Sequence, residues 1–402
     1  MATQIYDAGT PSSVGTNTVT HMYDRAGIEA ANEINIYQQW ADKKSMKQKM
    51  GKTFKISKFL HIYDRAKDDA EFAAKGFLSS RSLSTVSADI SANAALAEGA
   101  GAVNQVGIQK INMECSFARY GEMLPYTDEV ELWSEDYIQT RNREELGRLA
   151  NRRMEDLIQI DMLSTPTKMY ANDETSVSAL GTGILADDTN AENFQITFDL
   201  IRKASRKLVR NRCKKNTSIV TGSVKIDTRT VNKAFYSIVG PEVKYDLENI
   251  TRGAGNSEEL AFIPSFKYAA NGKMADGEFG QMHDVKFIES ETALVRTAAG
   301  AVVPQNYVGD LASSGGTDNT SATAADRDNF DVFPILIPTE GSFATVGLKG
   351  KNKIKFHQMG PLEALSNTNP YATNGFYSYN FFYAGIILDD TKLLEVDVLA
   401  TA

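Results

Sequence analysis

The sequence predicts an α+β fold in which an early long helix packs against late β-strands. Apolar residues recur at three- and four-residue steps between residues 127 and about 164, which is the spacing of one buried helix stripe. From residue 333 onward, short apolar runs alternate with turn residues, as they do in a β-rich segment. The chain has 402 residues and is 42% hydrophobic, so it can bury a large core and is expected to divide into roughly two or three domains.

Composition excludes several classes of protein. The chain has 43 Lys and Arg against 51 Asp and Glu, and a net charge of −8 argues against a protein that neutralises nucleic acid. Its two cysteines, Cys115 and Cys213, lie far apart, which argues against a disulfide framework and a paired-cysteine zinc site. The N-terminus lacks a signal-peptide pattern, and the longest apolar block, 381–388, is much shorter than the roughly twenty residues of a membrane span. We therefore expect a soluble protein made in the cytoplasm, with no membrane partner.

The first fifty residues contain a polar stretch and an amphipathic one. Residues 1 to about 20 are rich in Ser, Thr and Gly and predict a flexible arm. From about 26 to 50, apolar residues alternate with charge, and several lysines precede Gly51, as at the end of a helix. This predicted helix could pack on its own subunit or lie over a neighbour, and the sequence leaves both open.

Two segments with period-two alternation predict a pair of strands. The first runs from Thr53 to Ile62, and the second spans 111–118 with Ile111, Met113 and Cys115 on one face. Nearly fifty residues dominated by Ala, Ser and Gly lie between them. Connections longer than about fifteen residues are uncommon in compact domains and usually serve binding. We expect a long hairpin-like arm that reaches outward.

The rest of the chain predicts a strut and a mixed domain. Thr127 is the expected N-cap of a helix that runs to about Ser164, about 50 Å at 1.5 Å per residue. A second helix is expected at 197–210 and an exposed loop at 309–328. The expected strands are 218–224, 285–288, 333–337, 343–348, 354–356, 376–388 and 393–399.

A search for catalytic motifs is negative. Four scattered histidines form no pair at helical spacing, and neither a nucleophile elbow nor a phosphate-binding loop is present. The segment from Gly181 to Ala186 matches the dinucleotide fingerprint in its letters, but a polar stretch precedes it and Asp187 and Asp188 follow. We expect no enzyme activity, no cofactor and no metal, and we keep an unrelated enzyme that uses this loop as a remote alternative.

The strongest charge feature lies between 202 and 215, where eight residues are basic. Arg202, Arg206 and Arg210 align at four-residue steps on one side of the predicted helix. Three interpretations stay open: a solvated face, a contact with an acidic patch on a neighbouring subunit, and a contact with nucleic acid. The acidic balance of the chain favours the first two.

Five short segments, in this order, carry a family resemblance. They are Lys52–Lys58, Ala95–Gly99, Ala118–Gly121 followed by Tyr126–Asp128, Gly277–Gly280 leading to Val285–Ser290, and Asn369–Tyr371 continuing through Gly375–Tyr377 to Ile387–Asp389. With them the chain resembles the major capsid protein of tailed double-stranded DNA bacteriophages, in particular the coat-protein family typified by the podovirus N-four. That capsid fold is shared by encapsulins and the floor of the herpesvirus shell.

The resemblance implies a structural subunit without catalysis. Subunits would form the hexamers and pentamers of an icosahedral shell around double-stranded DNA, without sequence-specific binding. An encapsulin-like compartment is the alternative. The implied partners are other copies of the chain, portal and scaffold proteins and a decoration protein. The implied location is the virion, after assembly in the cytoplasm of the bacterial host.

The resemblance also implies a division of the chain and a set of contact residues. The expected parts are an N-terminal arm (1–51), an extended loop (52–118), a peripheral domain with the spine helix (119–195), an axial domain (196–345) and return strands of the peripheral domain (346–402). The expected subunit-interface residues are Phe54, Ile56, Glu98, Gly99, Ile111, Met113, Arg202, Arg206 and Arg210.

Overall fold

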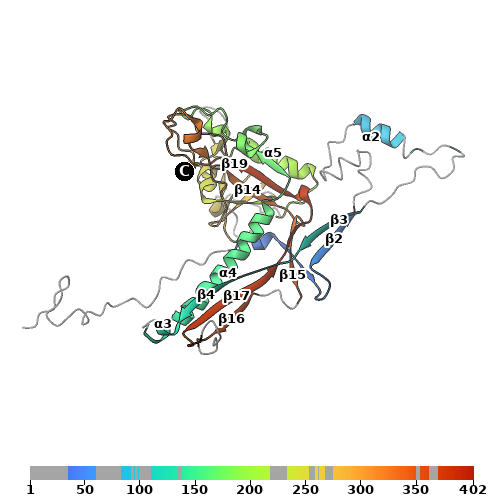
Figure 1. Cartoon of the computed structure of the whole chain (residues 1–402). Coiled ribbons are helices and arrows are strands. Elements are labelled where there is room, and N and C mark those ends of the chain that lie inside the picture. The colour runs from blue at the N-terminus through green and yellow to red at the C-terminus, as the bar shows by residue number, and fades with distance from the viewer. Residues whose placement is uncertain are drawn as a thin grey trace, which may run out of the picture.

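The structure is a computed structural model of the chain (Figure 1). It describes residues 35–59, 83–91, 95, 98, 110–133, 138–217, 233–252, 259–260, 262–267, 275–349, 354–361 and 370–402. The predicted flexible arm at 1–20 and the predicted strand at 218–224 lie outside these ranges.

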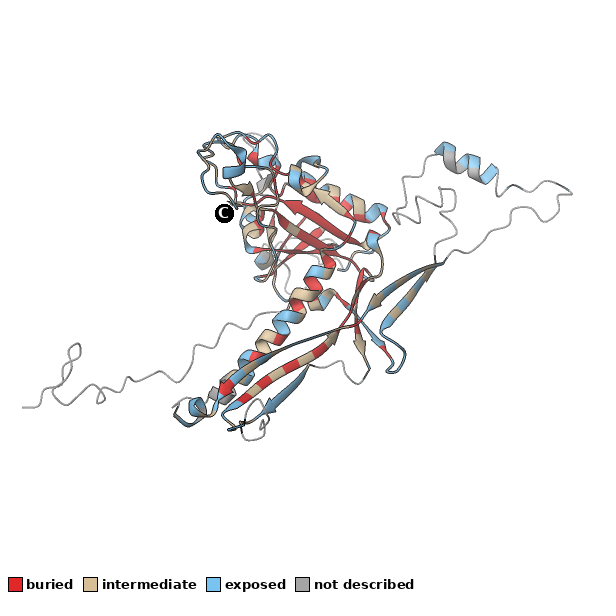
Figure 2. Ribbon diagram, viewed as in Figure 1, coloured by how far each residue is buried: buried red, intermediate tan, exposed pale blue. Residues whose placement is uncertain are grey.

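A mixed seven-stranded sheet forms the largest core. Its order is β5-β19-β14-β6-β11-β10-β9. The strands are β5 (Lys168–Tyr170), β6 (Phe235–Val239), β9 (Ile263–Pro264), β10 (Glu278–Met282), β11 (Val285–Glu289), β14 (Phe333–Pro338) and β19 (Leu393–Val398). Every residue of β6 and β19 is buried, as expected for strands covered on both faces. Figure 2 shows this concentration of buried residues in the sheet.

Helices α5 (Phe198–Arg210) and α6 (Pro241–Glu248) contribute to the core on one face of this sheet. The predicted helix at 197–210 is confirmed: Thr197 is its N-cap and accepts a hydrogen bond from Leu200 N at 3.2 Å. Leu200, Ala204 and Leu208 pack against Phe235 and other strand residues. The opposite face carries Ile238, Ile288 and Leu336, which pack with the C-terminal end of α4 (Ile138–Met162).

Helix α4 projects from this core as a strut beside a three-stranded sheet (Figure 1). The sheet has the order β16-β17-β4, with β4 (Ala118–Thr127), β16 (Lys355–Met359) and β17 (Asn374–Tyr383). Alternate residues of β17, including Tyr377, Tyr379 and Phe381, are buried in the cluster that contains the helix. The predicted long helix is confirmed over 138–162, and a short α3 (Asp128–Trp133) precedes it.

A third part consists of two small sheets. Strand β15 (Phe343–Leu348) lies between β1 (Asp42–Met46) and β18 (Gly385–Ile387), and the hairpin pairs β2 (Thr53–Phe59) with β3 (Lys110–Ser116). The helix predicted at 26–50 is wrong over the described residues, which form a 3₁₀ turn, η2 (Tyr37–Trp40), followed by β1. Five backbone positions of β1 pair in parallel with β15, and this tertiary pairing outweighs a weak helical pattern.

Most of the late strands lie where the sequence predicts them, and two differences stand out. Segment 346–402 is divided among three sheets, because β17 joins β4, β18 joins β15 and β19 joins β14. The loop at 309–328 carries internal bonds: Asp328 accepts hydrogen bonds from Gly316 N and Asn319 Nδ2, both at 2.6 Å. The minor elements are α2 (Leu83–Asp89), β7 (Thr251–Arg252), β8 (Glu259–Leu260), β12 (Ser313–Ser314), β13 (Asn329–Phe330) and 3₁₀ turns at Ala171–Asp173, Val177–Ala179, Ala191–Asn193, Ser265–Lys267, Ala324–Asp326 and Asp390–Lys392.

Candidate subunit interface

The β2/β3 hairpin projects from the body of the subunit (Figure 1). Ile56 lies opposite Met113 in the antiparallel register. Phe54, Ile56 and Met113 are half-buried because they pack against an apolar cluster of the same chain that includes Val346 and Ile386. One face of the predicted contact strands is therefore anchored on its own subunit. The other face is exposed.

The exposed face of the hairpin is polar and ends in an apolar residue. Lys55 forms an ion pair with Glu114 at 2.9 Å, and Ser57 bonds to Asn112 at 2.9 Å. Phe59 is 63% exposed at the end of β2. Exposed ion pairs contribute little to stability, so this face is available for other contacts.

The remaining predicted loop residues fall in different surroundings. Glu98 is exposed, Ile111 is half-buried opposite Lys58, and Gly99 lies outside the described residues. Lys58 reaches Asp389 at 2.5 Å and fixes the hairpin to the segment before β19. The structure thus brings Phe54, Ile56, Ile111 and Met113 together.

The basic run on and after α5 divides into bound and exposed residues. Lys203 pairs with Asp173 at 2.6 Å and with Asp199 at 3.3 Å. Lys207 donates to the carbonyl of Lys168 at 2.9 Å, and burial lowers its pKa. In contrast, Arg202, Arg206 and Arg210 are exposed on one side of the helix. The guanidinium of Arg202 lies 5.8 Å from the ring centre of Phe198.

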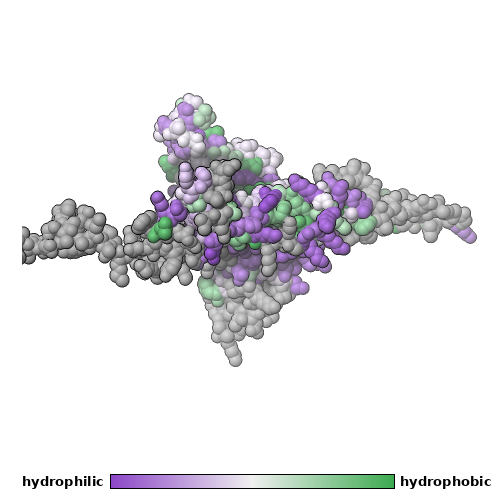
Figure 3. Space-filling model, turned by 60° about the horizontal axis from the view of Figure 1, so that its bottom comes forward, coloured by the Kyte–Doolittle hydropathy of each residue, from purple (hydrophilic) through white to green (hydrophobic). Residues whose placement is uncertain are grey.

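A further candidate surface, which the sequence analysis does not predict, is the outer face of the three-stranded sheet. By register, Pro125, Phe376 and Met359 form one row across its strands, on the side that β17 does not bury. Met123 is 60% exposed on the same side, and Arg119 lies 5.8 Å over the ring of Phe382. In the view of Figure 3, hydrophilic residues cover much of the coloured surface, with smaller hydrophobic areas between them. Alternate residues of a strand face opposite sides of a sheet, so recognising β4 as a strand would have predicted this face.

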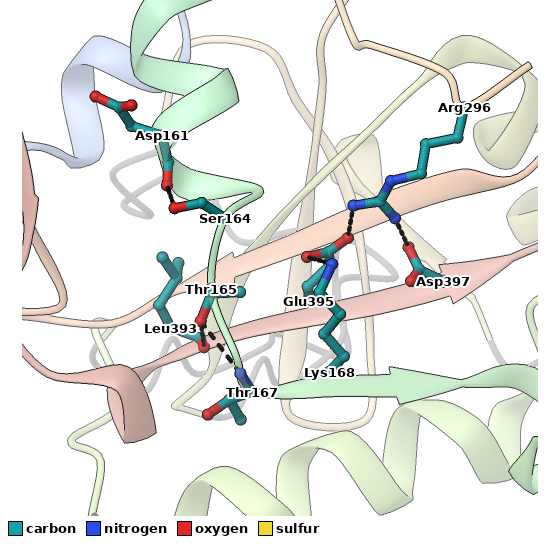
Figure 4. Close-up of polar contacts among 9 residues, drawn as sticks. All are labelled: Asp161, Ser164, Thr165, Thr167, Lys168, Arg296, Leu393, Glu395 and Asp397. Atoms are coloured by element: carbon teal, nitrogen blue, oxygen red, sulfur yellow. Dashed lines mark hydrogen bonds and ion pairs between the residues drawn. The ribbon is translucent and has the colours of Figure 1, made fainter. Parts of the chain in front are cut away.

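A cluster of buried charges lies on the seven-stranded sheet, close to the segment that follows α4 (Figure 4). Lys168 of β5 lies 3.0 Å from Glu395 of β19, and Arg296 donates to Asp397 Oδ1 at 2.6 Å and to Glu395. Burial, reinforced by the charge of Glu395 and opposed by Arg296, raises the pKa of Asp397 to about 7.

Hydrogen bonds continue this connection toward α4. Thr165 Oγ1 donates to the carbonyl of Leu393 at 3.1 Å, and Ser164 donates to the carbonyl of Asp161 at 2.6 Å (Figure 4). The segment that follows α4 is therefore bonded to the start of β19.

The structure also bears on metal, membrane and dinucleotide sites. In the ranges given above, no cluster of three His, Cys, Asp or Glu side chains could hold a metal ion, and no helix is long and apolar enough to cross a membrane. The segment from Gly181 to Ala186 follows a 3₁₀ turn and leads into further turns, without the strand and helix that a dinucleotide site requires. A Cβ at Gly181 would contact the Phe330 ring, so this glycine serves packing.

The structure is similar to those of phage capsid proteins. The capsid of Ralstonia phage GP4 matches 92% of this chain and 88% of its own chain with a TM-score of 0.54, at 9% identity. The head structure of Helicobacter pylori bacteriophage KHP40 matches 98% of this chain and 99% of its own, with a TM-score of 0.52 at 10% identity. The predicted α+β capsid fold is confirmed, and the chain has the fold of these phage capsid proteins.

A relative found by sequence similarity is also a phage capsid protein. Over 394 residues the chain is 28% identical to the major capsid protein of Pseudomonas phage KPP21. The aligned region covers 94% of this chain and 92% of the relative. The sequence matches no protein-family model. The resemblance to phage major capsid proteins indicated by the five sequence segments is confirmed by this relative and by the fold.

Proposed function

We propose that the chain is a phage major capsid protein, a structural subunit that assembles with copies of itself into the shell of a phage head. The strongest support is that a capsid fold and a relative named major capsid protein each match more than nine-tenths of the chain. The absence of a catalytic motif in the sequence agrees with a structural role. The relatives reported above are phage proteins, which does not favour an encapsulin-like compartment.

The proposed assembly is an icosahedral shell of hexamers and pentamers that encloses double-stranded DNA. The net charge of −8 suits a lining that DNA must enter and leave, because tight phosphate binding would oppose both movements. Portal, scaffold and decoration proteins are the proposed partners, and assembly takes place in the cytoplasm of the host. The five-part division of the chain from the N-terminal arm to the return strands is also part of the proposal.

The proposed contact residues belong to two surfaces and to the loop between β2 and β3. In the hairpin, Phe54, Ile56, Ile111 and Met113 hold the strands on the face toward the subunit's own body, and the opposite face with Phe59 is the part proposed to meet a neighbour. The second surface is the exposed arginine row of α5. Glu98 and Gly99 are the contact residues proposed within the loop. Exposed strand backbone and unpaired charge are groups that a neighbouring copy can satisfy.

Sedimentation velocity of the purified full-length chain tests this function. We expect capsomer-sized or larger species whose proportion rises with protein concentration, because self-association follows mass action. A single monomeric species at every concentration and salt condition, for the chain alone and in the presence of the other head proteins, would contradict the proposed function. Nucleic-acid absorbance of the assembled fraction separates shells that hold DNA from those that do not.

A further inference from the structure

The exposed row on α5 has the composition of a contact surface. Arg206 and Arg210 are exposed, and neither has an ion-pair partner among the described residues. Val209 lies beside them and is 52% exposed. Together with Arg202, these side chains form what we term the arginine row. An exposed apolar residue flanked by arginines is typical of protein interfaces, where arginine is enriched and lysine depleted.

An acidic groove lies beyond the other end of the same helix. It consists of two adjoining cavities of 660 and 400 Å³, which share Tyr245 and Thr401. Among the described residues, four carboxylate side chains and no Lys, Arg or His line them. The carboxylates are those of Glu192, Glu242, Asp246 and Asp310. Tyr245 is 62% exposed and offers an aromatic surface at the junction of the two cavities.

Three of the four carboxylates are available to a partner. Asp246 accepts hydrogen bonds from Thr401 N at 3.1 Å and Thr401 Oγ1 at 2.7 Å, so its charge is used within the subunit. Glu192 and Asp310 are exposed, and Glu242 is half-buried. The groove therefore presents three carboxylates opposite in sign to the arginine row.

The groove and the Arg206–Arg210 end of the arginine row lie toward opposite ends of one helix, and Arg202 lies near Phe198 at the groove end. Thr197 and Phe198, where α5 begins, belong to the lining of the groove, whereas the arginine row continues to Arg210, the last residue of α5. Thirteen residues at 1.5 Å per residue make this helix about 20 Å long. Complementary surfaces at opposite ends of a subunit allow a head-to-tail contact, which closes into a ring when the rotation is right.

We propose that the arginine row of one copy docks in the acidic groove of the next copy around a capsomer ring. Arg206 and Arg210 pair with Glu242, Asp310 and Glu192 of the neighbour, and Val209 packs near its Tyr245. This inference rests on the proposed function, because it names the surface that receives α5 in the assembly. Nucleic acid is the less favoured occupant of the row, since the acidic groove at the start of α5 would repel phosphate.

A charge-swap experiment in the full-length chain tests the pairing. The variant Arg206→Glu/Arg210→Glu and the variant Glu242→Lys/Asp310→Lys each place like charges in the contact, which disfavours docking. We expect each to lower the assembled fraction in sedimentation velocity by at least about tenfold, with a thermal melting curve like that of the wild type. The combination of all four substitutions restores opposite charges and should recover assembly. Arg206→Lys/Arg210→Lys keeps the charge and serves as the control.

The outcomes separate the pairing from the function. Assembly by the wild type without recovery in the fourfold variant would overturn the pairing and leave the proposed function intact. A wild type that never assembles would overturn both. If Arg206→Glu/Arg210→Glu assembles normally but loses affinity for a double-stranded DNA fragment, the row binds nucleic acid and the pairing is wrong.

Discussion

Arg296 holds two carboxylates of one strand, because its guanidinium donates to Asp397 Oδ1 at 2.6 Å and to Glu395 two positions earlier on β19. Lys168 of β5 lies 3.0 Å from the same Glu395. The side chains of both acids are fully buried, so their mutual repulsion is offset mainly by these two basic groups. The cluster therefore ties β5, which follows α4 in the chain, to β19.

The first prediction concerns Arg296. Arg296→Met keeps most of the side-chain volume but leaves Glu395 with Lys168 alone and Asp397 without its basic partner. Breaking a buried ion pair from one side costs about 3–5 kcal/mol. We expect a fall of about 3 kcal/mol in the free energy of unfolding, measured by urea denaturation. Arg148→Met, which removes an exposed ion pair with Glu145, is the control and should change stability by no more than about 0.5 kcal/mol. Equal effects in the two variants would contradict the role of Arg296.

The second prediction concerns pH. The pKa of Asp397 is raised to about 7 in the folded chain, mainly by burial, whereas an unfolded Asp titrates near 3.9. The folded chain therefore binds more protons between these values, and the contribution of Asp397 to stability is lost as pH rises through about 7. We expect the free energy of unfolding to be lower at pH 8 than at pH 6, by up to about 1.4 kcal/mol per pH unit for one proton.

Asp397→Asn isolates this contribution, because the amide does not titrate. Its stability should depend less steeply on pH between 6 and 8 than that of the wild type. Parallel curves for the two proteins would show that Asp397 does not titrate in this range.

Patterns within a short stretch of sequence predict the elements whose structure depends on residues close by along the chain. Alternation around Phe54 and Met113 was enough to predict the hairpin strands, and Thr197 followed by an apolar stripe predicted α5. The helix expected at 26–50 failed because β1 depends on β15, which is about 300 residues away along the chain. Pairing over such distances leaves no signal in a short window.

Separation along the chain also decides which candidate surfaces the sequence predicts. The arginine row was visible because Arg202, Arg206 and Arg210 repeat at helical spacing. The acidic groove was missed because Glu192, Glu242 and Asp310 come from three distant segments. The charge cluster around Arg296 was missed likewise, since its members are brought together only by sheet pairing.

The third prediction concerns the close approach of β4 and β17. A Cβ added at Gly121 would lie 2.4 Å from the carbonyl oxygen of Tyr379. Gly121→Ala should therefore separate the strands and lower the free energy of unfolding by about 1–3 kcal/mol in urea denaturation. At Gly147 in α4, an added Cβ meets nothing within 4 Å. Gly147→Ala is the matched control and should stabilise the chain by up to about 1 kcal/mol through helix propensity. A Gly121→Ala variant as stable as this control would refute the contact.

The fourth prediction concerns the extended loop. Deletion of residues 70–100 removes most of the connection between β2 and β3 but leaves both strands and their packing on the body. We expect a folded subunit with a melting temperature near that of the wild type and no shells in sedimentation velocity. Normal shells from the deleted chain would refute the role of this loop in subunit contact.

Electron microscopy of the purified full-length chain in negative stain tests the central claim most directly. A phage major capsid protein is expected to form closed shells or capsomer rings, with nucleic-acid absorbance of the same sample reporting the contents of the shells. A uniform field of small compact particles, unchanged by the addition of the other head proteins, would contradict the account.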